Sequence, residues 1–263
     1  MTDSLLVENK NNVLIITMSR PESRNALSSE MLDSLLENLI LASKNDNLKA
    51  LILTGAGSAF CSGGDIKSMA DNGYDQSAIH EKSVSLRRFM ESSRLLHEMA
   101  IPTIAIIPGA AAGAGFSLAL ACDLRIASDN AKFTTAFVRV GFSGDFGGSY
   151  YLTKIVGTAK ARELYYLGNI LKANEALNLG IINKLVSQDN LKSESDNLIK
   201  YFNNAPPIAL RYMKKNMNIA EKGDLKASLD AEALHHTICG NTEDHKNAAK
   251  AFLEKKNPVF IGR

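Results

Sequence analysis

Short apolar segments rich in β-branched residues alternate with helical segments along the first part of the chain, and this alternation limits the possible folds most strongly. Residues 13–18 (VLIITM) and 50–54 (ALILT) are bounded by polar residues or glycine, which is typical of buried strands. Between them, Ser28 or Ser29 can cap a helix. The apolar face of that helix consists of Met31, Leu32, Leu35, Leu36 and Leu39.

A second unit repeats this order, with a helix at 83–99, a strand at 103–108, a helix at 113–121 and a strand at 124–127. Because strand and helix alternate, the predicted fold class is α/β. After about residue 190 only helical patterns follow, at 191–202, 208–220, 225–239 and 242–253. Such a region cannot easily bury all its apolar faces alone, so we expect it to pack on the core or on a neighbouring subunit.

The charge balance argues against nucleic acid as a partner. Lys plus Arg number 30 against 28 for Asp plus Glu, and the basic residues are scattered along the chain. A few local Lys and Arg residues can still bind one phosphorylated small molecule. The histidines show no HExxH motif and no clustered Cys/His spacing, so we expect no metal site.

Cysteine usage and the first residues predict a cytoplasmic protein. Cys61, Cys122 and Cys239 have no CxxC spacing and an odd count, which favours a reducing compartment. The start, MTDSLLVENKNN, lacks the basic residues and continuous apolar stretch of a signal peptide. No run approaches the ~18 apolar residues of a membrane helix, so we expect no membrane partner.

Two glycine-rich turns from strand to helix are the first candidates for a functional site. Residues 55–69 (GAGSAFCSGGDIKSM) follow a predicted strand and lead into a helix that we expect to begin at Asp65. Gly63 and Gly64 let a ligand oxygen approach the main chain, and the helix start adds partial positive charge. The alternative is a tight connection without a ligand.

The second turn, residues 108–123 (PGAAAGAGFSLALACD), has the same layout. If the two preceding strands lie side by side, the N–H groups of Gly64 and Ala114 can converge on one oxygen atom, which is how an oxyanion hole is built. Neither turn has the Lys-Ser/Thr ending of a P-loop, and GAAAGAG lacks the GxGxxG spacing of a dinucleotide fold. Nucleotide hydrolysis and hydride transfer are therefore disfavoured.

Together with RPESRNAL, GFSGDFGGSYYLTKIVG, EALNLGIINKLV and FLEKKNPVFIGR, these two turns resemble the crotonase superfamily, which includes enoyl-CoA hydratases and isomerases. The resemblance covers essentially the whole chain in the right order. It implies a spiral of repeated ββα units with two near-perpendicular sheets. It also implies a catalytic, CoA-binding core in residues 1–199 and a helical trimerisation region in residues 200–263, giving a homotrimer or a dimer of trimers.

The resemblance also assigns roles to residues. The amides of Gly64 and Ala114 would hold the thioester oxygen of an acyl-CoA substrate. Positions that contact coenzyme A in the family correspond to Arg24, Ser62, Ile66 and Lys256. For the two cations, a solvated surface charge is the alternative. Coenzyme A would belong to the substrate, so no separate cofactor is expected.

The chain departs from the hydratases of this family at the acid/base positions. Hydratases carry two glutamates, and the matching positions here are Ser117 and Phe137. Neither residue can replace a carboxylate as a base near pH 7. The resemblance therefore argues against standard hydration by a glutamate pair.

Asp145 in GFSGDFGGSYYL is the candidate acid/base. Locally it can cap the apolar helix that follows it. Relatives with Asp here use it in double-bond isomerisation or in aromatic dehalogenation, but the dehalogenase partners, His and Trp, correspond to Met90 and Phe137. An isomerase needs one carboxylate to move a proton from C2 to C4 of a 3-enoyl thioester.

An apolar wall beside Asp145 would raise the pKa of its carboxyl group. The residues that can form this wall are Phe89, Met90, Phe137 and Phe142. The alternative role for each of them is core packing. The sequence thus predicts an enoyl-CoA isomerase. Two alternatives stay open. One is a hydratase that uses Asp145 with an unidentified partner, and the other is an inactive acyl-CoA-binding or scaffolding homologue.

Overall fold

A computed structural model describes residues 4–65 and 78–263 of the protein. Within these residues the strands form a six-stranded and a four-stranded sheet. The large sheet has the order β1-β2-β3-β5-β7-β10 and is parallel except for the pair β1 and β2. Its strands are β1 (Leu5–Lys10), β2 (Val13–Met18), β3 (Ala50–Gly55), β5 (Thr103–Ile107), β7 (Leu124–Ser128) and β10 (Lys184–Val186).

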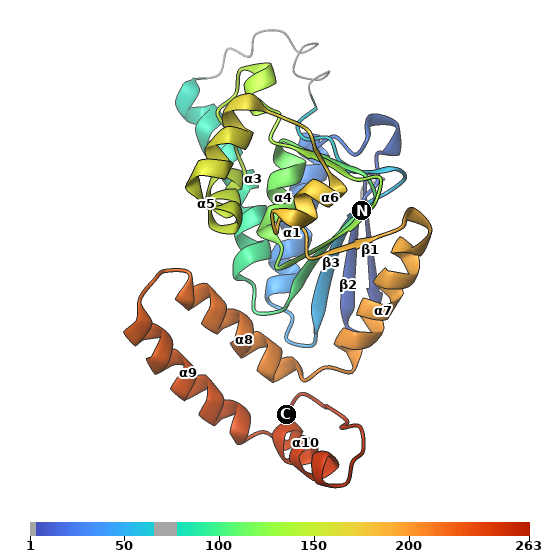
Figure 1. The fold of residues 1–263 in the computed structure, drawn as a ribbon, viewed down its shortest axis with the longest axis vertical. Helices are drawn as coiled ribbons and strands as arrows, with labels where there is room; N and C mark the ends of the chain where they lie inside the picture. The colour runs from blue at the N-terminus through green and yellow to red at the C-terminus, as the bar shows by residue number, and fades with distance from the viewer. Residues whose placement is uncertain (1–3, 66–77) are drawn as a thin grey trace.

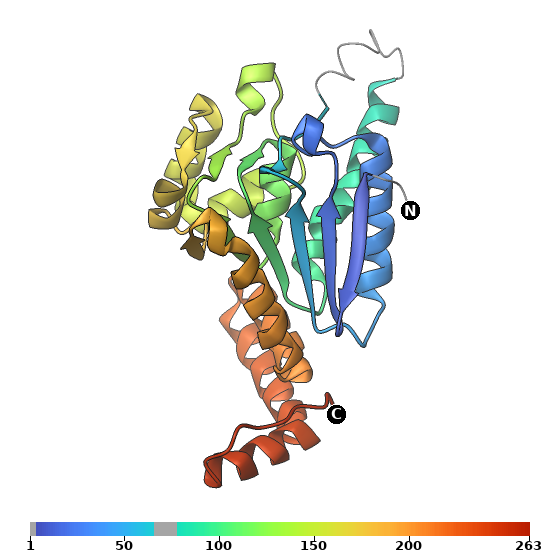
Figure 2. The same ribbon diagram turned by 90° about the vertical axis from the view of Figure 1, so that its right-hand side faces the viewer.

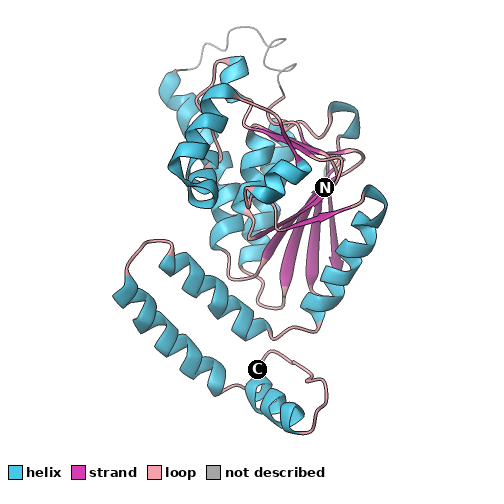
Figure 3. Ribbon diagram, in the orientation of Figure 1, coloured by secondary structure: helices cyan, strands magenta, loops and turns pink. Residues whose placement is uncertain are grey.

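The small sheet has the order β4-β6-β8-β9, and its strands run across the direction of the large sheet (Figure 3). They are β4 (Ala59–Cys61), β6 (Ala110–Ala112), β8 (Lys132–Thr134) and β9 (Leu171–Lys172). Each of the pairs β3/β4, β5/β6 and β7/β8 sends its first strand to the large sheet and its second to the small one. The expected α/β class and the two sheets of repeated ββα units are confirmed.

The helices of the body are α1 (Ser29–Ser43), α3 (Ile79–Glu98), α4 (Ala114–Ala121), α5 (Gly148–Leu167), α6 (Ala173–Asn178) and α7 (Leu191–Asn203). Three of them, α3, α4 and α5, follow these strand pairs, and the others follow β2, β9 and β10. The predicted cap is confirmed, because Ser28 Oγ accepts a hydrogen bond from Met31 N at 3.2 Å. Helix α3 begins four residues before the predicted start at residue 83. The helix expected to begin at Asp65 lies almost wholly outside the described residues.

The large sheet is buried on both faces because alternate residues of its strands point to opposite sides. Leu51 and Leu53 pack with α1, α3 and α4 in one cluster, whereas Ala50 and Ile52 pack against α7 in another. The near-continuous apolar strand ALILT follows directly from this double cover. The ends of the strands are thereby held in a rigid frame from which the glycine turns project.

Three C-terminal helices form an arm that extends away from the body (Figures 1 and 2). They are α8 (Pro207–Ala220), α9 (Leu225–Gly240) and α10 (Glu243–Leu253), and they match the predicted helical ranges closely. Lys214 on α8 fastens the arm to the body. Its buried Nζ lies 2.7 Å from Asp123 Oδ2 and donates hydrogen bonds to the carbonyl oxygens of Leu96 and Ile101.

The substitution Lys214→Met should lower the free energy of unfolding because it leaves the Asp123 carboxylate without its cation. We expect the free energy of unfolding to fall by about 2–3 kcal/mol. This loss is at the lower end of the range for broken buried ion pairs, because the Asp123 side chain is still 27% exposed. Urea unfolding at fixed protein concentration measures it. The neighbouring exposed residue provides the control Lys215→Met, which should change stability by less than about 0.5 kcal/mol. Equal effects of the two substitutions would contradict this role.

Candidate active site

The two glycine turns meet at the edge of the small sheet. Strands β4 and β6 pair in parallel, with Ala59 opposite Ala110 and Cys61 opposite Ala111. Gly63 has φ +94°, and a Cβ atom there would lie 2.9 Å from the carbonyl oxygen of Ala112. The strands therefore lie side by side, as the oxyanion-hole interpretation requires, and only glycine permits so close an approach.

The amides of Gly64 and Ala114 are both available to a ligand. Ala114 is the first residue of α4, so its N–H has no acceptor within the helix. Within the described part of the chain, neither amide donates a hydrogen bond to another residue. Both residues line a cavity of about 110 Å³. This geometry can stabilise negative charge on an oxygen atom that enters the cavity.

Asp145 lies in the wall of the same cavity. The lining consists of Ser62, Gly63, Gly64, Gly113, Ala114, Ala136, Phe137, Val140, Phe142 and Asp145. Burial among these mostly apolar groups raises the pKa of Asp145 from its usual value of 3.8 to about 6. Its buried Oδ1 atom accepts no hydrogen bond from the described residues.

The interpretation of Asp145 as a helix cap is wrong. Helix α5 begins at Gly148, its N-cap residue is Gly147 with φ +72°, and no side chain accepts a hydrogen bond there. Gly144 and Phe146 also have positive φ values of 117° and 47°. Because Phe146 is fully buried, the strained turn anchors its ring in the core while Asp145 faces the cavity.

The other predicted pocket residues occupy different places. Phe137 and Phe142 line the cavity, although Phe142 is 57% exposed. Met90 is half-buried on α3, packs against the large hydrophobic cluster and is not part of the described lining. Ser117 is buried behind the lining, where its hydroxyl donates to the Gly113 carbonyl oxygen at 3.3 Å. The cavity thus receives two of the four predicted side chains.

The residues expected to contact coenzyme A are only partly brought together. Ser62 N donates to the Arg24 carbonyl oxygen at 3.0 Å, and the exposed Arg24 stands next to the cavity residue Ser62. Ile66 lies outside the described residues. Lys256 follows α10 at the far end of the arm, away from the turn that holds Arg24 (Figures 1 and 2).

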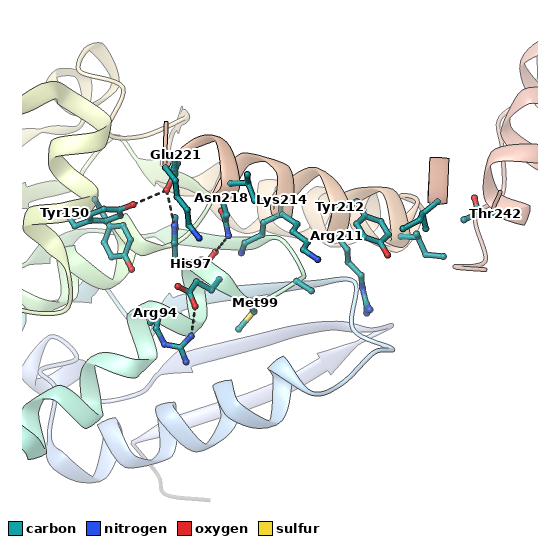
Figure 4. A pocket seen from close by; sticks show the side chains of 18 residues that line it. Arg94, His97, Met99, Tyr150, Arg211, Tyr212, Lys214, Asn218, Glu221 and Thr242 are labelled. Atoms are coloured by element: carbon teal, nitrogen blue, oxygen red, sulfur yellow. Dashed lines mark hydrogen bonds and ion pairs between the residues drawn. The ribbon is translucent and has the colours of Figure 1, made fainter. Parts of the chain in front are cut away.

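A larger cavity of about 930 Å³ lies elsewhere, between α8 and the body (Figure 4). There His97 Nε2 lies 3.1 Å from Glu221 Oε2, and Asn218 donates to the His97 carbonyl oxygen at 3.0 Å. None of its lining residues belongs to the cavity around Asp145. Its labelled side chains mainly join the arm to the body, so we place the candidate active site at the smaller cavity.

Two neighbours of Asp145 carry no signal in the sequence. Burial raises the pKa of the Cys61 thiol to about 12, and the charge of Asp145 contributes to this rise. Burial and, to a smaller extent, Asp145 also raise the pKa of Tyr165. Tyr165 is distant from Asp145 along the chain, and only the folding of α5 brings it close. Among the described residues, no group of three or more His, Cys, Asp or Glu side chains gathers that could hold a metal ion.

Comparison with known proteins agrees with this architecture. The family model Enoyl-CoA hydratase/isomerase matches residues 8–263. The chain is 34% identical to the 1,2-epoxyphenylacetyl-CoA isomerase of Escherichia coli K12, over 100% of both chains. It is 32% identical to the short-chain-enoyl-CoA hydratase of Clostridium acetobutylicum, over 97% of this chain and 96% of the relative.

Solved structures show the same fold. A crystal structure of an enoyl-CoA hydratase from Polaromonas sp. JS666 has a TM-score of 0.90 and 33% identity, and the match covers 98% of this chain and 99% of that one. The fold is that of the crotonase superfamily. Within it, the chain belongs to the enoyl-CoA hydratase/isomerase family.

The raised pKa of Asp145 makes the stability of the protein depend on pH. The folded chain holds this proton up to about pH 6, whereas the unfolded chain loses it near pH 3.8. Stability from this group is therefore present at low pH and is lost as pH rises through about 6. Asp145→Asn should raise the free energy of unfolding at pH 7.5 by about 1–2 kcal/mol, because it removes the buried charge.

Urea unfolding at pH 7.5 and at pH 4 measures this difference, which should nearly vanish at the lower pH. The exposed Asp189 supplies the control Asp189→Asn, for which no such dependence is expected. A stabilisation by Asp145→Asn that is equal at both pH values would show that the charge is not its cause.

Proposed function

We propose that the protein is an enoyl-CoA double-bond isomerase in which Asp145 is the general acid/base and the amides of Gly64 and Ala114 form the oxyanion hole. The observation that carries this proposal is the presence of one carboxyl group and two open backbone amides in the same cavity. Asp145 is the one carboxylate among the described residues that line the cavity, and it shares that cavity with the two open amides.

In the proposed reaction, the thioester oxygen accepts hydrogen bonds from both amides. Ionised Asp145 removes a proton from C2 of a 3-enoyl-CoA, and the electron pair of the C–H bond passes into the thioester as an enolate. Asp145 then returns the proton to C4, while the double bond forms between C2 and C3. A pKa of about 6 suits both steps, because the carboxyl group exchanges protons readily near neutral pH.

The side chains at the hydratase positions support isomerisation over hydration. The Ser117 hydroxyl is buried and donates its hydrogen bond to the Gly113 carbonyl oxygen. The ring of Phe137 stacks on that of Tyr165 at 5.9 Å between centroids. Neither group can activate water as a carboxylate does. The identity of 32% to a hydratase keeps hydration with Asp145 as the second candidate function.

We also propose that the arm joins copies of the chain into a trimer or a dimer of trimers in the cytoplasm. Large apolar side chains stand exposed on α9 and α10, among them Leu225, Leu229, Phe252 and Leu253 at 56–83%. In such an assembly, Lys256 of one copy and Arg24 and Ser62 of another can contact the same coenzyme A. In the described part of the chain, every helix is too short or too polar to span a bilayer.

Replacement of Asp145 tests the proposed chemistry directly. Asp145→Asn should lower kcat for isomerisation of a 3-enoyl-CoA by about 10²–10⁴-fold with little change in KM, because it removes the proton acceptor and keeps the shape. Asp189→Asn should leave both constants unchanged. Unchanged turnover in the Asp145 variant would exclude the proposed role. Hydration of crotonyl-CoA by the wild type at the rate of isomerisation or faster would favour the second candidate.

The oxyanion hole can be tested without changing a charge. Ala114 is the first residue of α4, a position where proline fits a helix, and Ala114→Pro removes the N–H group. We expect kcat to fall by about 10²–10³-fold. Circular dichroism and urea unfolding check that the variant is folded. A folded Ala114→Pro protein with normal kcat would contradict the role of this amide.

A further inference from the structure

Tyr165 supports the cavity from behind at two places. Its ring stacks on Phe137, with centroids 5.9 Å apart and planes 18° from parallel. It also contacts the turn that carries Asp145, because a Cβ atom at Gly144 would lie 3.0 Å from Tyr165 Cε1 and one at Gly148 would lie 2.6 Å from its hydroxyl. The tyrosine therefore lies against both the apolar wall and the acid/base turn.

The buried Oδ1 atom of Asp145 accepts no hydrogen bond within the described part of the chain. Buried polar atoms are nearly always hydrogen-bonded, and exceptions tend to have a function. The hydroxyl of the half-buried Tyr165 lies beside this turn, and no hydrogen bond to another described residue uses it. Asp145 lies between Gly144 and Gly148 in the chain, the two residues of this turn that approach Tyr165 closely, and its charge contributes to the raised pKa of the phenol.

We propose that Tyr165 is a positioning residue for the proton transfer: its ring holds the Asp145 turn in place, and its hydroxyl donates a hydrogen bond to the ionised carboxylate, directly or through one water molecule. This inference rests on the proposed function of Asp145 as acid/base. The phenol is suited to the role because its raised pKa keeps it protonated, and hence a donor, throughout the working pH range.

The hydrogen bond would favour the charged form of Asp145 and so limit the rise of its pKa that burial causes. The charge of Asp145 contributes to the raised pKa of two neighbouring ionisable side chains, Tyr165 on α5 and Cys61 on β4. Cys61 keeps its proton near neutral pH because its pKa is raised to about 12. Tyr165 is then the group whose removal should move the titration of Asp145.

The test compares Tyr165→Phe with Tyr166→Phe, since Tyr166 is the next residue and is 69% exposed. The dependence of kcat/KM on pH is measured for 3-enoyl-CoA isomerisation. In Tyr165→Phe the midpoint of the acid limb should move up by about 0.5–1 pH unit, because the base is ionised less readily. In Tyr166→Phe it should stay in place.

A second measurement needs no turnover. The carboxyl ¹³C resonance of Asp145 is titrated by NMR in the wild type and in both variants, and the same upward shift is expected only in Tyr165→Phe. Replacement of Tyr165 by 3-fluorotyrosine, a stronger donor, should move the titration down. An unchanged Asp145 titration in folded Tyr165→Phe protein would overturn the inference.

The two proposals fail in different ways. A wild type that isomerises no 3-enoyl-CoA, combined with a shifted ¹³C titration in Tyr165→Phe, would refute the proposed function and support the coupling of Tyr165 to Asp145. Isomerisation that requires Asp145 but has the same acid limb in Tyr165→Phe would support the function and refute the role of Tyr165.

Discussion

The parallel pairing of β4 with β6 is the contact on which the rest of the site depends. It brings Gly63 so close to Ala112 and Ala114 that no side chain fits between the turns. The amides of Gly64 and Ala114 therefore open into one cavity. Backbone groups held in this way are already oriented toward an incoming oxygen, and little reorganisation is needed when negative charge develops on it.

This contact is held in place because successive strands of the chain alternate between the large and the small sheet. Strand β3 leads into β4 and β5 leads into β6, so the large sheet fixes the start of each turn and the small sheet fixes its end. Asp145 lies in a separate turn, in which the preceding residue Gly144 and the two following residues, Phe146 and Gly147, have positive φ values. The two backbone amides and the Asp145 carboxyl group are thus held by different parts of the fold.

The sequence was sufficient to predict the features that depend on local pattern. The strands at 13–18 and 50–54, the Ser28 cap and the four C-terminal helices all follow from hydrophobic spacing and capping residues. Strands β4 and β6 were missed because three residues give no period, and they lie inside what reads as glycine-rich turns. Short strands of this kind are stabilised by tertiary pairing rather than by local preference.

In the candidate site, too, the residues with a local sequence signal were predicted and those placed by tertiary structure were not. The two glycine turns carry a local signal, family resemblance added Asp145 and Phe137, and the apolar wall predicted beside Asp145 added Phe142. All three side chains line the cavity. The interpretation of Asp145 as a helix cap was wrong because the N-cap residue of α5 is Gly147, in a left-handed conformation, and no side chain caps the helix. The place of Tyr165 could not be foreseen, since it depends on the path of α5 across the back of the cavity.

The contact between arm and body is more polar than the hydrophobic core. Lys214, Asn218 and Glu221 join α8 to the body through ion pairs and hydrogen bonds around a roomy cavity (Figure 4). Contacts of this kind are specific to their partners, because loss of the Lys214 ammonium leaves the Asp123 carboxylate without its cation. The position of the arm relative to the body therefore depends on a few polar pairs, and substitutions among them can change how the arm is set without changing the lining of the cavity around Asp145.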